Sequence, residues 1–193
     1  MKNGQGKIQD LLRDRSRDEI FELPFVYGQT IHYVPDRNHA DRSAVLPDYE
    51  CEVLFEKELQ SLRGLTGFEN ALAFDLDGGT STRAVCVARH DQKIIGVAGA
   101  AGSTVDGVWE VGADVQEEYR NAGLGSWLVG RLTEELLVRN IVPFYSASVT
   151  NLGSQIVVYR CGYRPMWIDT FGTVLDRSSV YDDLVKGLRL SLN

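Results

Sequence analysis

The residues from Trp109 to Asn140 constrain the fold most, because they join a strand pattern to a helix pattern through one short polar turn. Apolar side chains alternate from Trp109 to Val115, as in a strand with one buried face. From Leu124 onward a leucine recurs every fourth residue, which indicates a helix with a broad apolar face. The pattern predicts a buried strand, a tight turn over Gln116–Asn121 and a core-facing helix.

The entry to this helix, Arg120 to Ser126, is rich in small residues. The first amides of a helix have no intrahelical partner, and the helix dipole adds about half a positive charge there. Such an end can hold an anion. Gly123 and Gly125 would let phosphate oxygens reach the backbone N–H groups, and Arg120 and Ser126 could add side-chain donors. A pyrophosphate fits this description.

Two common phosphate motifs do not fit this turn. A Walker A loop needs Gly-Lys-Ser/Thr after its glycines, and a dinucleotide fingerprint needs G-x-G-x-x-G with an acidic residue about 20 residues on. Neither is present. A simpler alternative is that the glycines only turn the chain into a core helix. The run Asp75–Thr80, DLDGGT, has the sequence of an actin-type phosphate loop, but it lacks a companion motif and predicts a plain turn.

A second segment agrees with the first. Pro143–Val149 predicts a short strand, and Asn151 opens another helix that ends at Gly162-Tyr163. R-N-A-G-L-G after a strand, followed by this Asn-initiated helix, resembles the acyl-CoA signature Arg/Gln-x-x-Gly-x-Gly/Ala of the GNAT acyltransferase superfamily. The resemblance is specific over residues 93–168. It implies an α/β (α+β) GNAT fold, with a mixed, mostly antiparallel central sheet flanked by helices and strands splayed at the acyl-CoA site.

The remaining segments are predicted from periodicity and turn residues. Strands are expected over Phe25–Val34, Arg83–His90, Lys93–Ala101 and Tyr163–Thr173, helices over Lys7–Arg17, Cys51–Leu65 and Ser179–Leu190, and a loop over Asp36–Asp48. The strand at Arg83 and the next one should form a hairpin around Asp91-Gln92 and lead antiparallel into the strand at Trp109. We expect one domain over residues 1–193, with a peripheral segment at 1–20 and an acyl-CoA-binding core at 93–168.

Composition limits the partners. With a net charge of −7, the chain lacks the basic surface that a nucleic-acid-binding protein needs, and anionic membranes would repel it. We therefore expect neither a nucleic acid nor a membrane as partner. An amine substrate suits such a chain better. The three cysteines form no C-x-x-C pair and predict reduced, buried thiols rather than a metal site. No apolar run reaches spanning length and no secretion signal is present, which predicts a cytoplasmic protein. A homodimer is compatible with the sequence.

The resemblance implies acetyl-CoA as co-substrate and assigns residues to it. The strand whose backbone pairs with pantetheine would contribute three residues, the helix entry would take the pyrophosphate, and the second helix would face pantetheine from the other side. The cofactor-binding set is Ala113, Asp114, Val115, Arg120, Asn121, Ala122, Gly123, Leu124, Gly125, Ser126, Asn151 and Ser154. For Asn151, a plain helix N-cap is the alternative role.

Catalytic groups are harder to assign. The attacking amine must be neutral, which requires a base or a desolvated site, and Glu110, on the strand that enters the site, is the first candidate for a base. Asp114, Glu52 and His32 are further candidates. Many family members protonate the leaving thiolate with a tyrosine four residues before the closing glycine of the second helix, but that position is Val158 here. Tyr159 is one residue late and should point elsewhere; water or Ser148 could supply the proton.

These features predict an N-acetyltransferase that moves an acetyl group from acetyl-CoA to a primary amine of a small molecule or a protein by direct attack. A non-catalytic sensor that binds CoA or a metabolite is the alternative. A toxin-type enzyme acting on aminoacyl-tRNA is disfavoured by the charge of −7. The acyl acceptor and the acyl chain length do not follow from the sequence.

Overall fold

The computed structural model describes residues 25–36 and 49–174. The elements are β1 (Phe25–Pro35), β2 (Glu50–Phe55), the 3-10 helix η1 (Glu56–Leu62), β3 (Thr82–His90), β4 (Lys93–Gly102), β5 (Val108–Val115), the 3-10 helix η2 (Glu117–Tyr119), α3 (Leu124–Val138), β6 (Val142–Ser148), α4 (Leu152–Arg160) and β7 (Tyr163–Val174). The helices predicted over Lys7–Arg17 and Ser179–Leu190, and most of the loop predicted over Asp36–Asp48, lie outside the described residues.

The chain divides into two compact units, one of Ile31–Trp167 and one of residues 1–30 with 168–193. Every site residue considered below belongs to the unit Ile31–Trp167. The expectation of a single domain over residues 1–193 stays a prediction.

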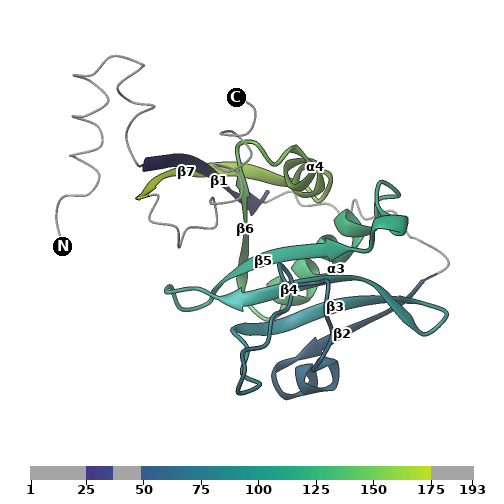
Figure 1. Ribbon diagram of the computed structural model, residues 1–193. Coiled ribbons are helices and arrows are strands. Elements are labelled where there is room, and N and C mark those ends of the chain that lie inside the picture. The colour runs from purple at the N-terminus through teal and green to yellow at the C-terminus, as the bar shows by residue number, and fades with distance from the viewer. Residues whose placement is uncertain (1–24, 37–48, 175–193) are drawn as a thin grey trace, which may run out of the picture. The chain divides into compact units, whose positions relative to one another are not determined.

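The strands form one mixed sheet in the order β2-β3-β4-β5-β6-β1-β7. β2, β3, β4 and β5, which lie side by side in Figure 1, pair antiparallel in succession, whereas β6 pairs parallel with β5. The hairpin between β3 and β4 turns at Asp91 and Gln92, whose φ angles of 49° and 66° suit the tight turn that matches strand twist. The predicted antiparallel meander and the GNAT-type mixed sheet are confirmed.

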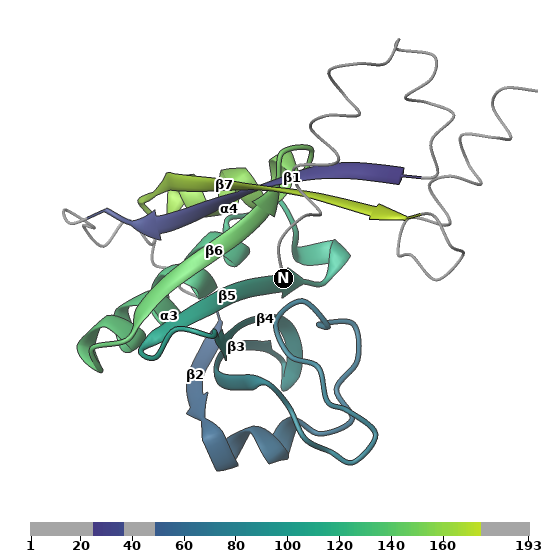
Figure 2. The same ribbon diagram turned by 90° about the vertical axis from the view of Figure 1, so that its left-hand side faces the viewer.

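Both faces of the central strands are buried. On one face, Ala84, Cys86 and Ala88 of β3 pack in a core cluster with the leucines of α3. On the other face, Val85 and Val87 pack under η1 and the loop that follows it. Figure 2 shows α3 on one side of these strands and the loop on the other. β3 therefore has apolar residues at successive positions rather than at alternate ones.

The helix predicted over Cys51–Leu65 is wrong. This stretch forms β2 and then η1, and the chain turns between them at Glu56, whose φ is +47°. The spacing of its apolar residues fits a helix and a strand alike. In the structure, Val53 and Phe55 contact the core cluster on the α3 side of the sheet, and Leu54 contacts the cluster on the other side. Pairing with β3 along the whole of β2 decides for the strand, because cross-strand hydrogen bonds and burial outweigh a weak local helix preference.

Candidate functional site

β5 and β6 separate along their length, and the site begins where they separate. Their parallel pairing runs from Val108 opposite Val142 to Val111 opposite Tyr145 and ends there. β5 continues to Val115, so its last residues have no partner on the β6 side. Figure 2 shows the two strands diverging toward their carboxyl ends. The splay predicted between these strands is confirmed.

The first turn of α3 is open. Gly123 is its N-cap residue, with φ of +89°, and no side chain caps the helix. The first intrahelical bond joins the Trp127 N–H to the Gly123 carbonyl, so the N–H groups of Leu124, Gly125 and Ser126 precede any intrahelical donor. The left-handed backbone of Asn121, with φ of +64°, and that of Gly123 shape this turn. The helix end is therefore available to an anion.

A groove of about 620 Å³ lies along this helix end and α4. Eleven of the predicted cofactor-binding residues line it: Ala113, Asp114, Val115, Arg120, Asn121, Gly123, Leu124, Gly125, Ser126, Asn151 and Ser154. Ala122 is exposed and does not line it. The Arg120 Nε donates to the Val115 carbonyl at 2.9 Å, which fixes this side chain beside the end of β5. Arg160 of α4 adds a second cation to the lining.

α4 presents its first turn to the same groove, but this helix is capped. The Asn151 Oδ1 accepts a hydrogen bond from the Ser154 N–H at 3.1 Å. The N-cap role considered for Asn151 is thereby confirmed, and its contact with a ligand stays a prediction. The two helix ends thus differ, because the amides of α3 lack a side-chain cap and one amide of α4 has one.

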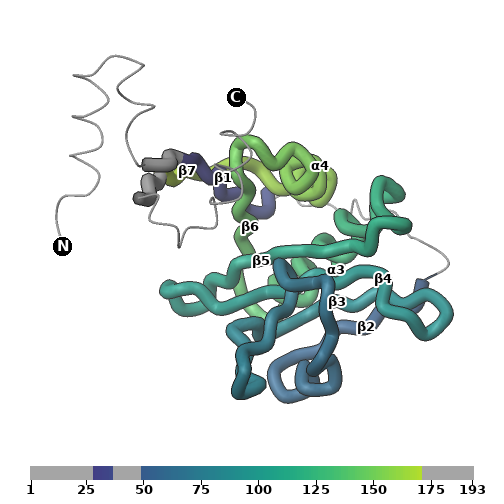
Figure 3. The backbone as a smooth tube through the Cα atoms, in the orientation of Figure 1, coloured from purple at the N-terminus to yellow at the C-terminus, as the bar shows by residue number. Residues whose placement is uncertain are grey.

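A loop crosses the sheet beside the groove, at a place that requires two glycines. Gly99 of β4 and Gly112 of β5 are directly opposed in the register. A Cβ at Gly99 would overlap the Ala71 carbonyl, and a Cβ at Gly112 would overlap the Asn70 carbonyl. The backbone of this loop, which can be followed between η1 and β3 in Figure 3, therefore lies directly on the strands.

Asp114 holds the same loop. Its carboxylate accepts from the Asn70 N–H at 2.8 Å, from the Asn70 side-chain amide at 2.7 Å and from the Ala71 N–H at 3.0 Å. Three donors occupy its oxygens. Asp114 lines the groove, and its carboxylate holds the loop in place through these three hydrogen bonds.

Under this loop is a second space of about 350 Å³, which we call the acidic cavity. Its ionisable lining residues are Glu69, Glu110 and Tyr145, and no lysine, arginine or histidine of the described residues lines it. The Gly67 N–H donates to the Glu69 carboxylate at 2.8 Å, and this hydrogen bond lowers the pKa of Glu69. The carboxylate of Glu69 therefore stays charged at neutral pH, and the cavity suits a cation.

The groove and the acidic cavity share part of their lining. The shared residues are Asn70, Ala113, Tyr145, Asn151 and Ser154. Tyr145 is the only titratable residue among them, and it stands at the last paired position of β6. Its side chain is buried, which raises the pKa of its hydroxyl, with the Ser154 side chain as hydrogen-bond partner. A neutral hydroxyl thus stands where the two spaces meet.

The candidate bases occupy different places. Glu110 lines the acidic cavity as an exposed residue of β5. Glu52 lines neither space and forms an ion pair with Arg89 at 2.7 Å on the outer strands. His32 does not line the cavity, but its Nδ1 is 2.9 Å from the Oγ of Ser146, which does.

The hydroxyls considered for proton donation lie elsewhere. Val158 is fully buried in the core, whereas Tyr159 is 54% exposed and packs edge-on against Tyr33 at 5.7 Å. Ser148 bonds to the Thr150 hydroxyl at 3.0 Å in the turn before α4. Neither Tyr159 nor Ser148 lines the groove or the acidic cavity.

Sequence reasoning missed Glu69, Asn70, Tyr145 and Arg160. The one sequence signal for the position of the loop is the pair of glycines inside two neighbouring strands, since a glycine within a strand often marks the close approach of another backbone.

Within the described ranges, no cluster of His, Cys, Asp or Glu could hold a metal ion. No helix in these ranges has the length and apolar character needed to cross a bilayer.

Comparison with known proteins agrees with this geometry. The model of the acetyltransferase (GNAT) family matches residues 54–163, more than half of the chain, including the loop, both helix ends and the splayed strands. A search of curated proteins found no match.

Solved structures share the fold. A GCN5-related N-acetyltransferase-like protein from Streptococcus suis is 17% identical, with a TM-score of 0.60 over 86% of this chain and 67% of its own. An acetyltransferase of the GNAT family from Colwellia psychrerythraea is 12% identical, with a TM-score of 0.56 over 85% of this chain and 59% of its own. The chain thus spans about three fifths to two thirds of the length of these relatives. With the family model covering the open helix end and the splayed strands, the chain belongs to the acetyltransferase (GNAT) family.

Proposed function

We propose that the protein transfers an acetyl group from acetyl-CoA to a primary amine of a small molecule or a protein. The observation that carries this proposal is the opposite charge of two adjoining spaces. The groove presents the open amides of α3 with Arg120 and Arg160, whereas the acidic cavity presents Glu69 and Glu110. An anionic donor and a cationic acceptor would thus approach the splay of β5 and β6 from separate sides.

Acetyl-CoA would supply the acyl group as a thioester, with its pyrophosphate on the first turn of α3. The chain's own contribution is mainly alignment, which can supply several kcal/mol when two reactants are held in register. Gly125 and Gly123 leave the amides accessible, and Ser154 and Asn151 form the opposite wall.

Two groups in the cavity could take the proton from the amine. A free alkylamine, with a pKa near ~10, enters protonated and must lose that proton before it attacks. Glu110 could accept the proton directly. The hydroxyl of Ser146 could accept it while passing its own proton to His32, since these two side chains are in contact. We assign the proton to the departing thiolate to Tyr145, the titratable side chain common to both spaces.

The acceptor class follows from the charge of the cavity. Amines that carry a second cationic or a neutral group should be acetylated better than amino acids, whose carboxylate would meet Glu69 and Glu110. A cytoplasmic location is part of the same proposal, since the thioester donor is a metabolite of that compartment.

An amine panel tests the proposal. Purified protein is incubated with acetyl-CoA and with diamines, monoamines, amino acids and lysine peptides, and free CoA thiol is followed. Turnover that favours cationic amines is expected. Tight binding of CoA without turnover on any amine would instead favour the sensor function, for which Val158 at the place of the family's tyrosine is the supporting observation.

A further inference from the structure

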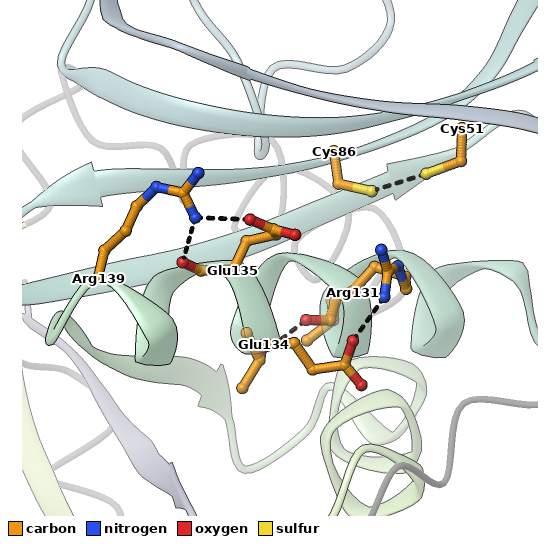
Figure 4. A network of polar contacts seen from close by, with 8 residues as sticks. Cys51, Cys86, Arg131, Glu134, Glu135 and Arg139 are labelled. Atoms are coloured by element: carbon orange, nitrogen blue, oxygen red, sulfur yellow. Dashed lines mark hydrogen bonds and ion pairs between the residues drawn. The ribbon is translucent and has the colours of Figure 1, made fainter.

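Two thiols lie close together at a place that belongs to neither the groove nor the acidic cavity. The Sγ atoms of Cys51 on β2 and Cys86 on β3 are 3.2 Å apart (Figure 4). In the antiparallel register, Cys51 is opposite Ala88 and Cys86 is opposite Val53. The two cysteines are therefore diagonal neighbours on one face of the sheet. Neither takes part in the function proposed above.

The two thiols differ in access. Cys51 is exposed and lines a surface groove with Trp127 and Arg131 of α3, whereas Cys86 is fully buried in the core. A small reagent in solution can therefore approach Cys51, whereas the protein core shields Cys86. This is the arrangement of an attacking thiol and a resolving thiol.

The surroundings favour ionisation of the exposed thiol over the buried one. The hydrogen bond from Cys86 lowers the pKa of Cys51, and the Arg131 guanidinium lowers it further, although burial and Glu52 act in the opposite direction. The same hydrogen bond and burial raise the pKa of Cys86. Arg131 also pairs with Glu134 at 2.7 Å, on the solvent side of α3 (Figure 4). Of the two thiols, Cys51 is therefore the one that loses its proton more readily.

We propose that Cys51 and Cys86 form an oxidation site for hydroperoxides, at which the Cys51 thiolate is the attacking group. The thiolate attacks the terminal peroxide oxygen, the O–O bond breaks, and Cys51 becomes a sulfenic acid while hydroxide or alkoxide leaves. The Cys86 sulfur then attacks the Cys51 sulfur, and the hydroxyl departs as water with the Cys86 proton. Two electrons pass from the thiols to the peroxide, and one disulfide forms.

The disulfide requires movement of an edge strand. The two sulfurs must approach from 3.2 Å to about 2.05 Å, and diagonal pairs start with their Cβ atoms farther apart than a relaxed disulfide allows. β2 is the terminal strand of the sheet among the described strands, so it can shift without breaking a second ladder. A disulfide strained in this way is readily reduced again, as a reversible modification requires.

The test needs no acyl acceptor and therefore stands apart from the proposed function. The reduced full chain is treated with hydrogen peroxide at neutral pH, and intact mass, free thiols and peptide maps are followed. We expect loss of two of the three thiols, a mass lower by two hydrogens, a Cys51–Cys86 linked peptide, and recovery with dithiothreitol.

Variants separate the roles. Cys51→Ser should abolish the disulfide, Cys86→Ala should leave a sulfenic acid at Cys51 that a dimedone-type reagent captures, and Arg131→Gln should slow the reaction severalfold. Cys161→Ser is the matched control, since Cys161 is buried away from the pair, and it should react like the parent. Oxidation of Cys161 at the rate of Cys51, a disulfide only between chains, or an unchanged product in Cys51→Ser would overturn the proposal. The Cys51→Ser arm remains decisive if Cys86→Ala does not fold.

Discussion

Gly125 allows the anion site to be tested with two substitutions of graded size. It is the second residue of α3, and it does not belong to the glycines whose backbone φ angle is positive, so its backbone conformation allows a side chain. A Cβ there would lie 3.5 Å from Val115 Cγ2 and 3.6 Å from Val157 Cγ2, which is ordinary contact. An alanine side chain at position 125 therefore fits without movement of the neighbouring residues. Both valines line the groove, so the Cβ lies between its two walls.

The two substitutions should act differently. Gly125→Ala replaces glycine in a helix and should raise stability by up to about 1 kcal/mol, with acetyl-CoA affinity close to the parent's. In Gly125→Val the γ-carbons extend about 1.5 Å beyond the Cβ. Because the only open space beside this Cβ among the described residues is the groove, the γ-carbons should enter the groove and displace the pyrophosphate from the helix amides. Loss of one charge-assisted hydrogen bond to the pyrophosphate costs about 1.5–3 kcal/mol, which is a rise in Kd of about 10- to 150-fold.

Calorimetric titration with acetyl-CoA measures the affinity, and thermal unfolding of the same samples shows whether each variant is folded. Leu137→Val is the control on the same helix, since Leu137 is exposed and lines neither the groove nor the acidic cavity. It should bind like the parent. If Gly125→Val is folded and binds acetyl-CoA with the parent's affinity, the donor does not lie on the first turn of α3.

Three further predictions concern single side chains. Tyr145→Phe should lower kcat by about 10²-fold or more with acetyl-CoA binding retained, whereas Tyr159→Phe should change kcat by a small factor; equal effects in steady-state kinetics would contradict the junction role of Tyr145. Glu69→Gln should raise KM for a cationic amine by about two- to fivefold at low salt, with no change for a neutral one, and a uniform change would contradict a charge effect. Burial raises the pKa of the Cys161 thiol to about 12 from an ordinary 9.0, so the unfolded chain loses this proton first as pH rises above 9. Stability should then fall by up to about 1.4 kcal/mol per pH unit between pH 9 and 12, and urea unfolding should show a shallower fall in Cys161→Ala.

Several elements could be predicted from the sequence because their signals are local. The apolar repeat that begins at Leu124 runs unbroken to Val138, and α3 has these bounds. Asp91-Gln92 sets the hairpin through two adjacent backbone angles. The open end of α3 belongs to the same class, since consecutive residues after a strand form it. Eleven of the twelve residues that the resemblance assigns to the cofactor line one groove, and their contact with a ligand stays a prediction.

The register of α4 was equally local. The closing Gly162 places the family's tyrosine at the position of Val158, and Val158 is buried while Tyr159 is exposed. One helical residue turns a side chain by about 100°, so a single position separates core from surface.

Tertiary structure decided what depends on distant partners. β2 has a pattern that fits helix and strand alike, and pairing with β3 selected the strand. The Asp114 carboxylate holds the loop because the Asn70 and Ala71 amides, more than 40 residues away in the sequence, donate hydrogen bonds to it. The contact between His32 and Ser146 spans 114 residues of sequence. Local periodicity carries no information about such contacts, since they exist only after the sheet has brought its strands together.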